Sequence, residues 1–194
     1  MKLCGLTGGV GMGKSTAAGF FSKWGVRIID TDELAHDLVE PGQPALEEIQ
    51  KAFGAQVLGA DGRLKRGELA RLVFAEPAAR RTLEAILHPR IREQWRSQVA
   101  LWRQEHHPVA MVVIPLLYET GAEADFDRVI CVACSPAGQQ ARLRARGWPP
   151  EQVEGRIAAQ WPIEQKIARA HFVIWTEGSV ENHGRQIERV VQKL

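Results

Sequence analysis

A glycine-rich run near the beginning of the chain has the residue types that bind phosphate groups. Residues 8–15 match the pattern G-x-x-x-x-G-K-[ST]; an apolar segment, 3–7, precedes them and a segment with helical spacing, 16–24, follows. Glycines allow backbone N–H groups to approach phosphate oxygens, and the first turn of a helix adds partial positive charge. The run therefore predicts an ATP site formed by Gly8, Gly9, Val10, Gly11, Met12, Gly13, Lys14, Ser15 and Thr16.

Two side chains at the end of this run could act on the nucleotide directly. Lys14 can contact the β- and γ-phosphates, and the hydroxyl of Ser15 can bind an Mg²⁺ ion that bridges phosphate oxygens. Such an ion neutralises the charge that develops during phosphoryl transfer. Because the pattern arises by chance in roughly three of a thousand chains of this composition, we favour a nucleotide site over a glycine-rich turn without a ligand.

Two aspartates follow a second apolar segment, 26–30. Asp30 closes the segment and Asp32 comes two residues later, at the carboxyl end of a strand, where open α/β sheets bind ligands. If the strand continues, the two carboxylates share a face, and either could accept a proton from an acceptor hydroxyl or help to hold Mg²⁺. Alternatively, at least one of them caps or opens the next helix, which is an ordinary role for Asp.

Arginines are candidates for stabilising the transferred phosphoryl group. Arg142 and Arg146 lie four residues apart on one face of a predicted helix, 136–146, just before a Gly-Trp-Pro-Pro break. Closure of the segment that follows could bring their guanidinium groups onto the phosphoryl group. Arg144 and Arg156 are nearby alternatives, and many arginines on exposed helices are only solvated.

Short apolar segments alternate with longer helical patterns along the chain, which is typical of a parallel sheet with helices on its faces. The predicted strands are 3–7, 26–30, 110–116, 128–134 and 172–175. About eighty residues separate the second strand from the third, which is more than one crossover helix needs. This stretch is therefore expected to form a helical subdomain, with helices over 31–39, 44–53, 66–74, 77–87 and 89–105.

The predicted fold class is α/β, a P-loop NTPase fold in which helices flank a five-stranded parallel sheet. A helix with Ser135 as its N-cap precedes the break, and a second helix, 151–159, follows it, so this second insertion has the form of a lid. The expected domains are a nucleotide-binding core over 1–30, 107–146 and 171–194, a helical insertion over 31–106, and a lid over 147–170.

Charge and cysteine content narrow the function classes. The net charge is only +2, so the overall charge indicates neither nucleic acid nor a membrane as a partner. Between residues 63 and 103, however, there are ten Lys or Arg against four Asp or Glu, which fits either an anionic ligand or a solvated helical face. Three cysteines, no long apolar run and no leader-like beginning predict a cytoplasmic protein without a disulfide framework.

The sequence argues against two other classes of P-loop protein, the motor-type and recombination ATPases and the GTPases. Motor-type and recombination ATPases end this strand with a carboxylate, whereas this chain has none until Glu119. The Asn-Lys-x-Asp guanine reader of GTPases is absent from the sequence. A small-molecule kinase fits the pattern better.

Several further segments, in the same order, resemble the dephospho-CoA kinase family along nearly the whole chain. The first of them leads into the glycine-rich run, and the others are spread over the predicted insertion, the third strand and the lid. The matching segments are 6–11, 29–32, 34–36, 39–42, Leu87-His88-Pro89, Pro115-Leu116-Leu117-Tyr118-Glu119, Ser135-Pro136, and 156–160 with Lys166 and Ala170.

The resemblance implies a P-loop core with a helical CoA-binding insertion and a lid, and transfer of the γ-phosphoryl group of ATP to the ribose 3′-hydroxyl of dephospho-CoA. By this similarity Asp32 is the general base, Lys14 and Ser15 serve ATP and Mg²⁺, and Arg142 and Arg146 are the lid-side arginines. His88 and Leu116 lie with Asp32 in the acceptor-binding region. Members of the family usually continue the fifth strand as Ile-Asp-Asn, near the adenine, where this chain has Ile174-Trp175-Thr176-Glu177-Gly178.

Two other functions remain open from the sequence. The acceptor could be a nucleoside monophosphate or another small alcohol, although the long arginine-rich insertion favours a large anionic acceptor. An ATP-responsive binding module is the non-enzymatic alternative, but such a protein does not need a carboxylate such as Asp32 on the acceptor side. The expected partners are ATP and dephospho-CoA, with no nucleic acid or membrane, and the expected state is a monomer or weak oligomer.

Overall fold

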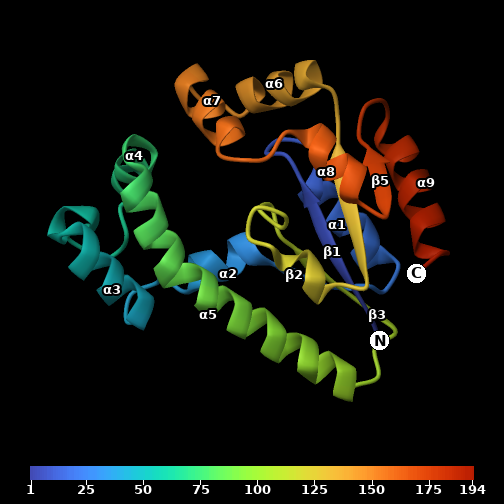
Figure 1. Cartoon of the computed structure of the whole chain (residues 1–194), viewed down its shortest axis with the longest axis horizontal. Helices are drawn as coiled ribbons and strands as arrows, with labels where there is room; N and C mark the ends of the chain where they lie inside the picture. The colour runs from blue at the N-terminus through green and yellow to red at the C-terminus, as the bar shows by residue number, and fades with distance from the viewer. The chain divides into compact units, whose positions relative to one another are not determined.

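Five parallel strands form one sheet in the order β2-β3-β1-β4-β5 (Figure 1). The strands are β1 (Lys2–Gly8), β2 (Arg27–Asp30), β3 (Val109–Val113), β4 (Arg128–Ala133) and β5 (Phe172–Trp175). The predicted α/β fold with a five-stranded parallel sheet is therefore confirmed. Because strands of this kind present their carboxyl ends at one edge, the loops after β1, β3, β4 and β5 meet there.

The structure, a computed structural model, describes residues 1–194 with the exception of the side chain of Phe74. The chain divides into two units, which are Met1–Ile29 with Trp102–Leu194, and Asp30–Leu101. No helix among the described residues is both long and apolar enough to cross a membrane.

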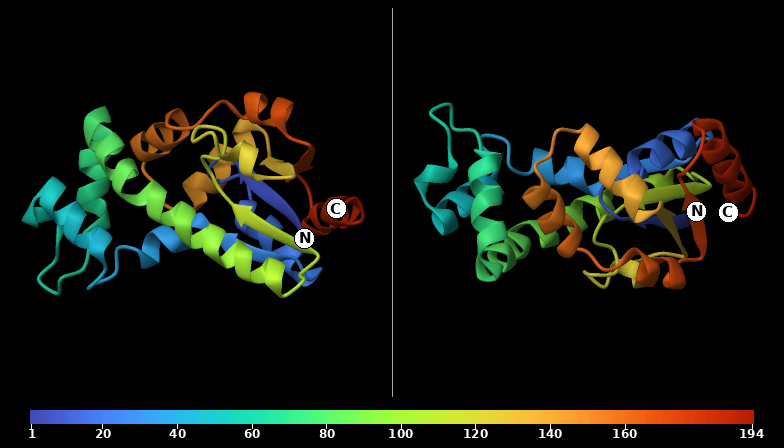
Figure 2. Two further views of the ribbon diagram at one scale, coloured as in Figure 1. Left: turned by 60° about the horizontal axis from the view of Figure 1, so that its bottom comes forward. Right: turned by 90° about the horizontal axis from the view of Figure 1, so that it is seen from above.

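Alternating residues of the central strand bury different partners on the two faces of the sheet. Cys4 and Leu6 belong to a cluster with side chains of α1 (Lys14–Lys23) and α9 (Val180–Val191), and Figure 2 shows α9 beside the strands in both views. On the opposite face, a Cβ at Gly5 would lie 2.6 Å from Leu117 Cδ1, so the segment after β3 packs directly against β1. The helix α8 (Ile163–Arg169) contacts β1 and β4.

The third strand is shorter than predicted. It ends at Val113, whereas the sequence predicts a strand over 110–116. Ile114 still donates its N–H to Leu6 O (2.9 Å), but Pro115 has no N–H and cannot continue the ladder. The Pro115 carbonyl instead accepts from the Thr7 hydroxyl (3.2 Å), and the chain turns through the short helix η2 (Ala122–Asp125).

The second unit is helical, as the eighty-residue spacing predicts. It contains α2 (Thr31–Asp37), α3 (Pro44–Phe53), η1 (Ala55–Val57), α4 (Arg66–Ala75) and most of α5 (Pro77–Gln104). Its core is a separate apolar cluster formed by Val39, Leu46, Ile49, Val57 and Leu69, with partly buried side chains of α5 packed against it. This unit therefore buries apolar surface of its own.

The prediction of two helices over 77–87 and 89–105 is wrong, because α5 continues through Pro89. A proline inside a helix removes one hydrogen bond, and the helix persists only where other contacts hold it. Here Ile86 packs against the apolar cluster of this unit. Arg90 donates to Ile86 O (2.6 Å) and pairs with Glu48 (2.6 Å), so one guanidinium group holds the turn that contains the proline.

Two helices follow β4 before the chain reaches α8. The helix α6 (Pro136–Ala145) begins at the predicted N-cap, where the Ser135 hydroxyl accepts from Gly138 N (3.1 Å). It ends before Gly147, whose φ of 74° lies in the left-handed region that favours glycine. The helix α7 (Pro150–Ala158) follows this break. Neither α8 nor α9 was delimited by the sequence patterns.

Candidate active site

The loop between β1 and α1 adopts a backbone that only glycine allows at several positions. The φ angles of Gly8, Gly11 and Gly13 are 147°, 74° and 99°. A Cβ at Gly8 would lie 2.2 Å from Val132 O on the neighbouring strand. Gly13 is the N-cap of α1, which has no side-chain cap and no acidic residue in its first turn, so the backbone N–H groups there can receive an anion.

Lys14 is placed directly over this loop. Its Nζ donates to Gly8 O (3.0 Å) and to Gly9 O (3.1 Å), and it is partly buried. Ser15 and Thr16 follow in the first turn of α1 with exposed side chains. The structure thus brings together the nine residues predicted to bind ATP. The exposed hydroxyl of Ser15 fits an Mg²⁺ ion that is held mainly by phosphate oxygens.

The helix α6 packs closely against the same loop. A Cβ at Gly9 would meet Gln139 Nε2 at 3.1 Å, and a Cβ at Gly11 would meet Leu143 Cγ at 2.8 Å. Gln139 and Leu143 lie four residues apart on one face of α6. The lack of side chains at Gly9 and Gly11 therefore allows α6 to approach the loop closely.

Arg142 lies on the same face of α6 and contacts the residue that follows β5. Its Nη1 donates to Thr176 Oγ1 (2.7 Å) and its Nη2 donates to the Thr176 carbonyl oxygen. The Thr176 hydroxyl also contacts Met12 O (2.9 Å), and the threonine is buried. Thr176, which stands where the family usually has Asn, therefore links the phosphate-binding loop to Arg142.

The next residue, Glu177, ties the end of β5 to the beginning of α6. Its carboxylate accepts hydrogen bonds from the backbone N–H and the hydroxyl of Ser135, and from Trp175 Nε1 (3.1 Å). The Ser135 hydroxyl is the main reason why the pKa of Glu177 lies below its usual range. The loop after β4 and the loop after β5 are thus joined by hydrogen bonds at the carboxyl edge of the sheet.

The other arginines near the break differ in their surroundings. Arg146 is the C-cap of α6 and is exposed, as is Arg144. The guanidinium carbon of Arg156 in α7 lies 4.4 Å from the centre of the Trp148 ring, in a cation–π contact. Of the two predicted lid-side arginines, Arg142 therefore binds Thr176, whereas Arg146 is exposed at the end of α6.

The two aspartates do not share a strand face, because β2 ends at Asp30. Asp30 is the N-cap of α2, and its Oδ1 accepts from Asp32 N (2.9 Å). Asp32 lies in the first turn of α2 with an exposed side chain. The alternative in which one aspartate caps the helix is therefore correct for Asp30. Asp32 and the partly buried His88 of α5 belong to the unit Asp30–Leu101, whereas Leu116 follows β3 in the other unit.

A buried ion pair that the sequence did not reveal joins α8 to the segment after β3. Lys166 of α8 is fully buried, and its Nζ lies 2.7 Å from Glu119 Oε1 and donates to Pro115 O (2.8 Å). Glu119 Oε1 also accepts from Trp161 N (2.7 Å). Removing one member of such a pair leaves an uncompensated buried charge, so the pair fixes α8 to the segment after β3.

The chain resembles known proteins along most of its length. The sequence model of dephospho-CoA kinase matches residues 2–182. A dephospho-CoA kinase of Anaeromyxobacter dehalogenans is 44% identical over 100% of this chain and 92% of its own length. A solved structure from Thermus thermophilus is 34% identical with a TM-score of 0.84, covering 100% of this chain and 97% of that one. The solved structure of the dephospho-CoA kinase of Campylobacter jejuni is 26% identical with a TM-score of 0.72, and the match covers 100% of this chain and 97% of that one. The chain belongs to the dephospho-CoA kinase family, whose members are ATP-dependent kinases.

Proposed function

We propose that this chain transfers the γ-phosphoryl group of ATP to the ribose 3′-hydroxyl of dephospho-CoA, producing coenzyme A and ADP. The observation that carries the proposal is the loop from Gly8 to Thr16, with its glycine-only backbone, its uncapped helix N-terminus and Lys14 directly over it. Together these groups form a cradle for a polyphosphate. The family membership supports dephospho-CoA as the acceptor.

Each part of the loop has a proposed role. The backbone N–H groups and Lys14 bind the β- and γ-phosphates. The ammonium group of Lys14 also stabilises the negative charge that develops during transfer. Ser15 would contribute its hydroxyl to Mg²⁺, which when bound lowers the cost of charge build-up on the phosphate oxygens. These residues orient the γ-phosphoryl group for attack, which is the main task in phosphoryl transfer.

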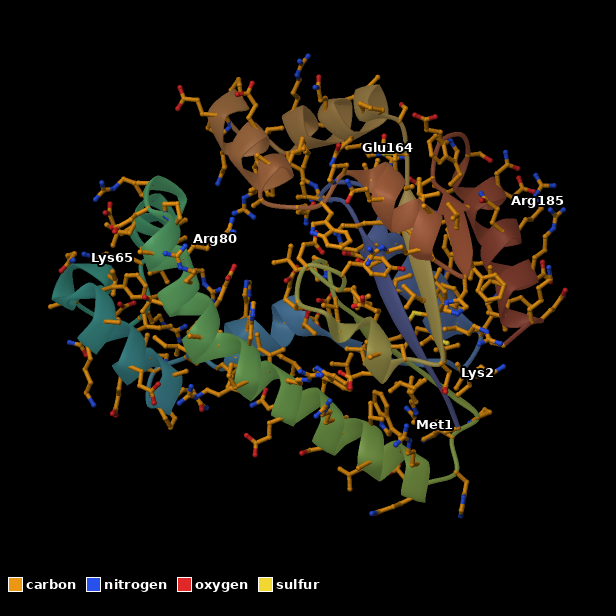
Figure 3. All side chains as sticks on the ribbon, viewed as in Figure 1. Met1, Lys2, Lys65, Arg80, Glu164 and Arg185 are labelled. Carbon is orange, nitrogen blue, oxygen red and sulfur yellow. The ribbon has the colours of Figure 1, made fainter. Side chains whose placement is uncertain are left out.

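The unit Asp30–Leu101, which contains His88, is proposed to bind the acceptor. Leu116, in the segment after β3, is proposed as an acceptor residue on the family resemblance alone. Its excess of cations is partly balanced, because Arg80, labelled in Figure 3, pairs with Glu84 at 3.4 Å. Lys65, also labelled, and Arg81 are exposed and form no ion pair with a described carboxylate. Such cations suit the phosphate groups of a CoA precursor. Asp32, exposed in the first turn of α2, is the proposed general base.

The segment 147–170 is proposed to act as a lid of which only the first part moves. The buried Lys166 holds α8 on the sheet, so closure would involve α7 and the break before it. Because Arg146 is exposed beside this break, we propose that it reaches the transferring phosphoryl group on closure.

Replacement of the two arginines is expected to have different effects. Arg146→Lys keeps the charge but loses the planar fork, so kcat should fall about tenfold or more with KM for ATP nearly unchanged. Arg142→Lys should also raise KM for ATP, because it breaks the contacts with Thr176 that support the loop. Steady-state kinetics at varied ATP would measure both, with exposed Arg144→Lys as the control. A rise in KM without loss of kcat in Arg146→Lys would mean that this residue only binds nucleotide.

The acceptor is tested by ADP release from Mg-ATP in the presence of dephospho-CoA, AMP or pantetheine, or without an acceptor. We expect dephospho-CoA to stimulate release strongly and the smaller compounds to have little effect. Stimulation by AMP instead would assign the chain to nucleoside monophosphate phosphorylation. Release that no acceptor stimulates would support an ATP-responsive binding module.

A further inference from the structure

Two glutamine side chains hold the backbone N–H and the backbone C=O of Val10, which belong to the two successive peptide units that meet at its Cα. Gln160 Oε1 accepts from Val10 N (2.8 Å), and Gln139 Nε2 donates to Val10 O (2.7 Å). A backbone N–H can only donate and a carbonyl oxygen can only accept, so these contacts fix which amide atom each glutamine presents. Gln160 acts here as an acceptor and Gln139 acts as a donor.

The two glutamines come from elements of different kinds. Gln139 is buried in α6, on the face that also carries Leu143, which lies against Gly11, and Arg142, which contacts Thr176. Gln160 lies in the connection between α7 and α8, and the N–H of its neighbour Trp161 donates to Glu119. The chain leaving α7 is therefore fixed at two consecutive residues, first to the phosphate-binding loop and then to the segment after β3.

The backbone at Val10 is a sensitive point in the loop because a glycine lies on each side of it. Gly9 and Gly11 flank Val10, and Gly11 has a positive φ of 74°. Glycine gives this segment many accessible conformations, and only one of them directs the loop N–H groups at phosphate. Holding the N–H of one peptide unit and the C=O of the next restrains the φ and ψ angles of Val10 before the nucleotide binds. Such restraint is the preorganisation that electrostatic catalysis requires.

We propose that Gln139 and Gln160 are positioning residues that clamp the backbone on both sides of the Val10 Cα, and that Gln160 in addition couples nucleotide binding to α7. When a nucleotide orders the loop, Val10 N–H is held in place for Gln160, and the connection that carries α7 is held with it. Gln139, which lies in α6, stabilises the loop without this second effect. The inference rests on the proposed function only in taking ATP as the ligand of the loop.

Substitution by methionine removes the hydrogen bonds while keeping the side-chain volume. Gln139→Met and Gln160→Met should each raise the KM for ATP about tenfold, the effect of losing one hydrogen bond and leaving its partner unsatisfied. The KM for dephospho-CoA should change little, and the melting temperature should fall by about 2–4 °C, the scale that one lost hydrogen bond implies for a chain of this size. The matched controls are Gln140→Met on α6 and Gln165→Met on α8, both exposed. Unchanged KM for ATP in both clamp variants would overturn the clamp.

A glutamate pair separates the hydrogen-bond polarity from packing and charge. Gln139→Glu and Gln160→Glu each add one negative charge next to the backbone of Val10. Gln160→Glu keeps an acceptor for Val10 N–H, whereas Gln139→Glu removes the donor and places a carboxylate against Val10 O. Gln139→Glu should therefore bind ATP at least about tenfold more weakly than Gln160→Glu. Equal affinities, or the reverse order, would contradict the assigned polarity even if one methionine variant folds poorly.

The coupling is tested by hydrogen exchange of the full chain with and without ADP, and no acceptor is needed. In the unchanged protein, ADP should slow exchange both in α1 and in α7. In Gln160→Met, ADP should still slow exchange in α1 but no longer in α7. In Gln139→Met, ADP should slow exchange in both helices. If ADP still slows α7 in Gln160→Met, the coupling is wrong. Because this measurement does not involve dephospho-CoA, its result is independent of whether the proposed acceptor is correct.

Discussion

Lys14→Ala is expected to lower turnover by about two to three orders of magnitude, the scale on which a single group that stabilises transition-state charge contributes. The substitution removes the ammonium group that the structure holds against Gly8 O and Gly9 O. It also leaves those carbonyls without this donor, so the free energy of unfolding should fall by about 1 kcal/mol. Single-turnover rates at saturating ATP, together with thermal melting, separate the two effects.

The control for this variant is Lys23→Ala. Lys23 is an exposed cation in the last turn of the same helix, and its ammonium group lies 5.4 Å from the centre of the Phe20 ring. Its removal should leave turnover within about twofold of the unchanged protein. Near-normal turnover in Lys14→Ala would end the argument that this loop binds the transferred phosphoryl group.

Asp32→Asn is expected to lower the turnover of dephospho-CoA at least about a hundredfold while ATP still binds. A ribose hydroxyl is a poor nucleophile at neutral pH, and a carboxylate within hydrogen-bond reach can orient it and accept its proton. The amide keeps the shape of the side chain but loses its basicity and charge. Turnover and ATP affinity should be measured on the same preparation, because only the first should change.

The matched control is Asp30→Asn. Asparagine is as good an N-cap as aspartate, so the contact with Asp32 N should survive and α2 should keep its beginning. Turnover should then change little unless Asp30 helps to hold Mg²⁺. If Asp30→Asn loses turnover and Asp32→Asn does not, the base is assigned to the wrong carboxylate. If neither variant matters, this segment does not perform base catalysis.

Local signals in the sequence predicted the elements that carry the nucleotide. The apolar segment before Gly8, the glycine pattern and the helical spacing after Ser15 specify a strand, a loop and a helix without information from distant residues. Ser135 followed by Pro136 likewise predicted where α6 begins, and the structure agrees. The family resemblance named the acceptor, which no spacing of residues in this chain could have done.

The parts that were missed depend on contacts between distant residues. Pro89 predicted a helix break, but Arg90 and the packing of Ile86 hold α5 together across it. The two glutamine contacts with Val10 span 129 and 150 residues of the chain. A glutamine that clamps a loop has the same local sequence signature as one that faces water. Only the fold distinguishes Gln139 from its exposed neighbour Gln140.

The central claim is tested most directly by following the transferred group itself. The purified protein would be incubated with dephospho-CoA, Mg²⁺ and ATP carrying ¹⁸O in its γ-phosphoryl group, and the products analysed by mass spectrometry before and after treatment with a 3′-nucleotidase. We predict a product heavier than unlabelled coenzyme A by the mass difference of the transferred ¹⁸O atoms, which the nucleotidase converts back to unlabelled dephospho-CoA. Label that appears only in free phosphate, or in a product that resists the nucleotidase, would contradict transfer to the ribose 3′-hydroxyl.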